Sequence, residues 1–195
     1  DMAGARDSFE RALEAAQKYQ MRLLLAQALD GLGQVAQEED DLETARQNYR
    51  DAQELWLATG SQNAHIAGVH LALLLLEQAD YEPARQALLE THQLVVAGTL
   101  PQVGQIVDAG LMVCAAVDGD VDMFDTLNRE LRELLRQTPA PDVKVPEVTF
   151  LAGQKWAEVG DRVRARKAYD IARNVFLALG EQKSADEVAF AIGRL

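Results

Sequence analysis

The sequence DLETARQNYRDA, from Asp41 to Ala52, is one copy of a pattern that recurs along the whole chain and indicates its fold. Each copy has a small residue, a large apolar residue four positions later and usually a small residue three positions after that. The triplets are Ala5/Phe9/Ala12, Ala45/Tyr49/Ala52, Ala84/Leu88/Thr91, Phe124/Asn128/Leu131 and Ala165/Tyr169/Ala172. Their first members are 40, 39, 40 and 41 residues apart. A near-constant period of this length indicates a repeat protein in which each repeat covers the apolar face of its neighbour.

The spacing of apolar residues predicts helices over nearly the whole chain. They are expected at about 1–19, 22–38, 62–78, 102–117, 120–136, 161–179 and 184–195, with three more ending near Ala58, Gly98 and Val159. We call the helices that carry the triplets second-type. We call the helices between them first-type. Each first-type helix carries a two-residue motif, and the first copy of this motif is Leu32-Gly33. Gly33 is expected to let a neighbouring helix approach closely. Asp40 and Glu43 form a candidate capping box for the helix that follows them.

The triplet spacing, the Leu-Gly pair and the helix-turn-helix unit resemble the tetratricopeptide repeat (TPR) family over essentially the whole chain. The resemblance is specific at 41–52, 80–91 and 161–172, good at 1–12 and weak at 120–131. It implies an all-α, right-handed superhelical solenoid of about five TPR-like helix-turn-helix repeats, forming one domain over residues 1–195. The period is about 40 residues rather than the usual 34, which resembles the extended repeats of bacterial signalling and regulatory proteins. HEAT repeats have a similar period, but the triplet spacing favours TPR.

Composition narrows the classes of function. The chain is 48% hydrophobic and has a formal net charge of −12, which disfavours binding to nucleic acid or to an anionic membrane. No apolar run reaches membrane-spanning length, and the lone Cys114 and the absence of a signal pattern indicate the cytoplasm. Because the chain begins with a second-type helix and lacks an initiator Met, we expect a fragment of a longer protein.

Searches for catalytic, metal and cofactor patterns favour none of these functions. The string Gly31-Leu-Gly-Gln-Val-Ala36 matches a dinucleotide-binding fingerprint, but it is preceded by a predicted helix instead of a strand. Asp118 to Asp122 resembles the start of a calcium loop, but Met123 stands where that loop needs Gly. His65 and His70 are five residues apart, which places them on different sides of a helix. We therefore expect no enzyme activity, no cofactor and no metal.

The TPR resemblance implies that first-type helices line a concave groove that binds a partner. Residues about one turn from the Leu-Gly position then face the groove, namely Asp30, Gln34, His70, Leu74, Glu77, Ala109, Val113, Phe150 and Gln154. No Lys or Arg occurs between Gln53 and Asp80, so the groove lacks the basic set that captures chaperone C-termini in other TPR proteins. An apolar centre with acidic and amide ends predicts a peptide or amphipathic helix with basic flanks.

These features predict a non-catalytic protein–protein interaction module, the scaffold or regulatory region of a signalling protein. The partner is a protein or peptide, which could belong to the same longer chain, and self-association through the same face is an alternative. A further alternative is plain core, in which the apolar helices are covered within the fold. The second functional class is a ligand- or signal-peptide sensor that relays to an attached effector domain.

Overall fold

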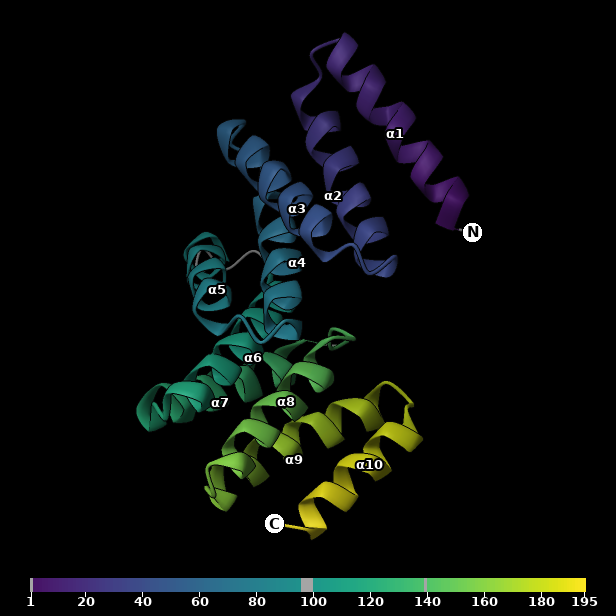
Figure 1. Ribbon diagram of the computed structural model, residues 1–195. Helices are drawn as coiled ribbons and strands as arrows, with labels where there is room; N and C mark the ends of the chain where they lie inside the picture. Colours follow the sequence, from purple (N-terminus) through teal and green to yellow (C-terminus); the bar gives the residue numbers. More distant parts are fainter. Residues whose placement is uncertain (1, 96–99, 139) are drawn as a thin grey trace. The chain divides into compact units, whose positions relative to one another are not determined.

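The computed structural model describes residues 2–95, 100–138 and 140–195, and this part of the chain is all-helical (Figure 1). It forms two compact units, residues 1–80 and 81–195. The first unit contains α1 (Met2–Lys18), α2 (Arg22–Glu38), α3 (Leu42–Ala58) and α4 (Ala64–Glu77). The second contains α5 (Tyr81–Val95), α6 (Pro101–Asp118), α7 (Val121–Gln137), α8 (Val145–Glu158), α9 (Arg162–Ala178) and α10 (Gln182–Gly193). The helix end expected at Gly98-Thr99 and the first residue, Asp1, lie outside the described residues.

Within each unit, most helices that are neighbours in the sequence pack against each other. In the first unit α2 packs on α1 and α3, and α3 packs on α4. In the second unit α6 packs on α5, α7 and α8, and α9 packs on α8 and α10. The all-α architecture with packing between successive helices confirms the helical-repeat prediction.

The repeated triplets form the core, as their spacing predicts. Ala45, Tyr49 and Ala52 are buried, and so are the corresponding residues of the three later copies, whereas the first copy is half-buried. The glycine of the Leu-Gly pair makes room for the aromatic residue of the triplet. A Cβ on Gly33 would lie 2.6 Å from the Tyr49 ring, and a Cβ on Gly153 would lie 2.4 Å from the ring of Tyr169. The expected close approach at Gly33 is therefore confirmed.

Most of the described turns between helices share one geometry. After α1, α2, α3, α4, α6, α8 and α9, a residue in the left-handed region ends the helix, and the amide after it donates to a carbonyl five residues earlier, as Asp120 does to Ala115 at 2.9 Å. The end of α7 differs, because Thr138 there is extended. Glycine allows the left-handed backbone without strain, and it occupies the left-handed position at Gly60, Gly119, Gly160 and Gly180. The same geometry corrects the predicted capping box. Asp40 is the left-handed residue, with φ of 63°, and Asp41 caps α3 by accepting a hydrogen bond from the Thr44 amide.

Ion pairs link the second-type helices to the ends of the first-type helices that follow them. The pairs are Arg6–Glu39, Arg46–Asp80 and Arg85–Asp118. At the corresponding position of α7 the sign is reversed. Asp125 accepts from Arg164 and from Lys167, each at 2.7 Å, and so joins α7 to α9. The charge reversal coincides with the copy in which Phe124 replaces the small residue of the triplet.

Candidate functional site

Four of the predicted groove residues meet in one polar cluster in the first unit. Asp30 on α2 is 7% exposed, and its Oδ1 lies 2.8 Å from Nδ1 of His70 on α4. Its other oxygen, Oδ2, accepts a 3.0 Å hydrogen bond from Gln34. Glu77, the last residue of α4, accepts a 2.9 Å hydrogen bond from Gln37. The cluster thus joins two successive first-type helices through side chains that stand one repeat apart.

Two residues absent from the prediction complete this cluster. The Tyr49 hydroxyl donates to Oε1 of Gln37 at 2.9 Å, and its ring lies 5.3 Å from the His70 ring at an angle of 45°. Burial raises the pKa of Tyr49, and the charges of Asp30 and Glu77 raise it further, so the hydroxyl stays a neutral donor. We call Asp30, Gln34, Gln37, Tyr49, His70 and Glu77 the unit 1 polar cluster.

A signal for Gln37 was present in the sequence. Asp30 and His70 are 40 residues apart, and Gln37 and Glu77 are also 40 apart. Pairing polar residues at equivalent repeat positions would have found Gln37. Tyr49 was assigned to the core by its triplet, and its buried ring indeed packs there while its hydroxyl reaches the cluster.

The apolar part of the predicted groove is not exposed. The side chains of Leu74, Ala109 and Val113 are fully buried. The prediction that they face an open groove is therefore wrong, and the physical reason is clearest for α6. This helix is apolar nearly all round because it packs on α5, α7 and α8, which leaves Ala109 and Val113 no solvent-facing side.

The remaining predicted residues lie on α8. Phe150 is half-buried, with its ring 5.3 Å from the Tyr169 ring, and Gln154 is exposed. Both belong to the second unit, so they are not members of the unit 1 polar cluster. Partner binding by any of the nine residues stays a prediction.

The Asp30–His70 pair resembles the orienting half of a hydrolytic triad, in which the histidine is also hydrogen-bonded to a nucleophilic hydroxyl or thiol. In the described parts of the chain, no hydroxyl or thiol is hydrogen-bonded to His70. The serine hydroxyls at 8 and 184 donate to groups on their own helices or turns, and Ser61 accepts from the Asn63 amide. Cys114 is buried, and burial raises the pKa of its thiol to about 11, which disfavours the reactive thiolate.

The described residues, 2–95, 100–138 and 140–195, contain neither a metal-binding cluster nor a membrane-spanning helix. Over these ranges, no group of three or more His, Cys, Asp or Glu side chains is placed to hold a metal ion. None of the helices there combines the length and apolar character needed to cross a bilayer.

Comparison with known proteins identifies a similar fold but no family. No protein-family model matches the chain, and no curated protein sequence matches it. Among solved structures, the chain is similar to BtubC (BKLC) from P. vanneervenii, with a TM-score of 0.65 and 15% sequence identity. The alignment covers 99% of this chain and 88% of that one. At this identity the likeness concerns the fold alone.

Proposed function

We propose that this chain is a non-catalytic protein–protein interaction module, the scaffold or regulatory region of a cytoplasmic, bacterial signalling protein. Its repeats are of TPR type and wind as a right-handed superhelix. A partner peptide docks on the first-type helices α2 and α4. The observation that carries the proposal is the unit 1 polar cluster, which gathers side chains from two successive repeats into one partly exposed surface.

The composition of the cluster favours a partner segment with basic or amide donors. Asp30 and Glu77 supply two carboxylates, and no Lys or Arg belongs to the cluster. Gln34 and Glu77 are exposed, so an approaching peptide can reach their polar atoms. The buried Asp30 and Tyr49 hold His70 and Gln37 in place through hydrogen bonds and ring contact, so little side-chain freedom is lost on binding.

Two features support the TPR-type interpretation of the repeats. The small-residue positions of first-type helices receive the aromatic residues of second-type helices, at Gly33 and Gly153. The left-handed turn followed by a capping residue also returns from repeat to repeat.

Affinity capture from lysate of the source organism tests the proposal. Gln34→Arg and Glu77→Arg place a like charge where a basic partner would dock, and both positions are exposed, so the fold should be retained. Glu54→Arg on α3 makes a similar charge change at an exposed position outside the cluster. All variants are first checked for unchanged helical circular dichroism and melting.

We expect a protein that wild type and Glu54→Arg retain and that both cluster variants lose. Identical captures by all the folded baits would contradict docking at the cluster. Light scattering of the isolated chain tests the alternative of self-association, because a dimer lost in the cluster variants would make a second copy the partner.

A further inference from the structure

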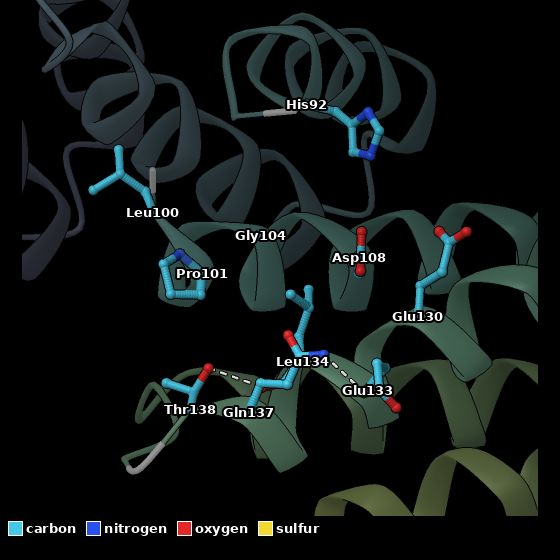
Figure 2. A pocket seen from close by; sticks show the side chains of 10 residues that line it. All are labelled: His92, Leu100, Pro101, Gly104, Asp108, Glu130, Glu133, Leu134, Gln137 and Thr138. Carbon is cyan, nitrogen blue, oxygen red and sulfur yellow. Dashed lines mark hydrogen bonds between the residues drawn. The ribbon is translucent and has the colours of Figure 1, made fainter. Parts of the chain in front are cut away.

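The second unit contains a pocket of about 580 Å³ between α5, α6 and α7 (Figure 2). Its size falls in the range of small-ligand sites. Leu100, Pro101 and Leu134 supply apolar walls, and the buried Gly104 leaves the backbone of α6 uncovered by a side chain. The pocket therefore combines apolar surface with the charged groups described next.

A buried carboxylate without a partner lies in this pocket. Asp108 is only 3% exposed, and it forms no hydrogen bond or ion pair with any described residue. Asp30 is buried to a similar degree but has two partners, His70 and Gln34. Buried charged groups are normally paired with an opposite charge, because moving an unpaired charge out of water costs free energy. Burial and the nearby Glu130 raise the pKa of Asp108 to about 7, which reflects the missing counter-charge.

The other charged groups of the pocket are mostly acidic. Figure 2 shows Asp108 of α6 and Glu130 of α7, whose carboxylates both point toward the side where His92 of α5 lies. Glu133 is paired with Arg136 at 2.9 Å, whereas Glu130 has no ion-pair partner among the described residues. Among the described residues that line the pocket, His92 is the one basic residue, and no Lys or Arg there neutralises Asp108.

We propose that this pocket binds an organic cation, specifically an alkylammonium group, with Asp108 as its buried counter-ion and Glu130 at the exposed rim. The apolar walls suit the methylene stem of such a group while its charged end meets the carboxylate. Two kinds of molecule carry an alkylammonium group of this type: a free diamine and a peptide with a lysine side chain. The site is separate from the unit 1 polar cluster and does not depend on the function proposed for it.

Isothermal titration calorimetry at pH 8, where the Asp108 carboxyl is ionised, tests the proposal with the whole chain. The probes are 1,5-diaminopentane and N-acetyl-lysine methylamide, and N-acetyl-norleucine methylamide is the uncharged control. The variants are Asp108→Asn, which removes the charge at nearly constant volume, and Glu187→Gln, which removes an exposed carboxylate on α10 as a matched control.

At least one cationic probe is expected to bind wild type and Glu187→Gln equally, and to bind Asp108→Asn at least tenfold more weakly. The uncharged probe should not bind. Binding of the diamine alone assigns the pocket to a free small cation, whereas binding of the lysine derivative assigns it to a peptide side chain. Absence of binding by both cations, or equal binding by wild type and a folded Asp108→Asn, overturns the proposal.

Discussion

Replacing Asp108 by Asn should change the stability of the second unit in a strongly pH-dependent way, with the more favourable effect at high pH. The pKa of Asp108 is about 7 in the folded chain, against an ordinary value of 3.8. Between these two pKa values the folded protein keeps the proton on Asp108, whereas the unfolded chain loses it. The free energy of unfolding therefore falls as the pH rises from about 4 to about 7. The full shift corresponds to about 4 kcal/mol of unfolding free energy above pH 7. Asn is neutral throughout and escapes this loss.

The absolute effect of the substitution contains a second contribution. The Asn amide is itself buried and lacks a partner, which costs about 1–3 kcal/mol at every pH. The diagnostic quantity is therefore the difference between two pH values. From the two pKa values, the gain in unfolding free energy should be about 2–3 kcal/mol larger at pH 8 than at pH 5.

Urea unfolding followed by tryptophan fluorescence measures this difference. A Trp56→Phe background leaves Trp156 as the reporter of the second unit, since it is buried on α8 with its ring 5.3 Å from the Phe124 ring of α7. The control Glu187→Gln removes an exposed carboxylate and should shift stability by less than about 0.5 kcal/mol at both pH values. An equal effect of Asp108→Asn at pH 5 and pH 8 would refute the reasoning.

Other predictions follow from the packing of the repeats. Gly153→Ala should lower the unfolding free energy by about 1–3 kcal/mol despite the better helix propensity of Ala, because the new Cβ would lie 2.4 Å from the Tyr169 ring; urea unfolding with no loss would contradict this packing. Gly160→Ala should cost about 1 kcal/mol by the same measurement, purely from strain at φ of 82°, since nothing lies within 4 Å of the added Cβ. Val113→Arg should unfold the second unit, because it buries an unpaired charge; a native circular dichroism spectrum and melting temperature would instead support an open groove. Burial raises the pKa of Asp125, but hydrogen bonds from Lys167 and Arg164 lower it by more, to below its ordinary 3.8. With solvent screening of this partly exposed carboxylate, Asp125→Asn should cost about 0.5–1 kcal/mol at pH 7, and urea unfolding should show that cost shrinking as the pH falls below 3.8.

The helical architecture could be predicted because the signal repeats. The period of the triplets and the spacing of apolar residues predicted successive packed helices, and the Gly33 position predicted a close helix approach. The capping register was wrong by one residue, because two adjacent aspartates are equally good candidates from sequence. Only the backbone shows that Asp40 occupies the left-handed position and Asp41 the cap.

The candidate sites could be predicted in part. Asp30, Gln34, His70 and Glu77 were predicted from their distance to the Leu-Gly position, because that distance determines which face of the helix a residue lies on. The burial of Val113 could not be predicted from its distance to the Leu-Gly position, because an apolar residue on a first-type helix can line an open groove or pack in the core. Asp108 carried an available signal: it is the only charged residue between Gln102 and Val117.

Site-specific photo-cross-linking tests the central claim most directly, namely that a partner docks on the unit 1 polar cluster. A benzophenone amino acid is placed at the exposed position of Gln34, and in a matched control at the exposed position of Glu54 on α3. With a partner retained by wild type, the account predicts a cross-link from position 34 to a basic segment of that partner, and none from position 54. A cross-link from position 54 without one from position 34 would contradict it.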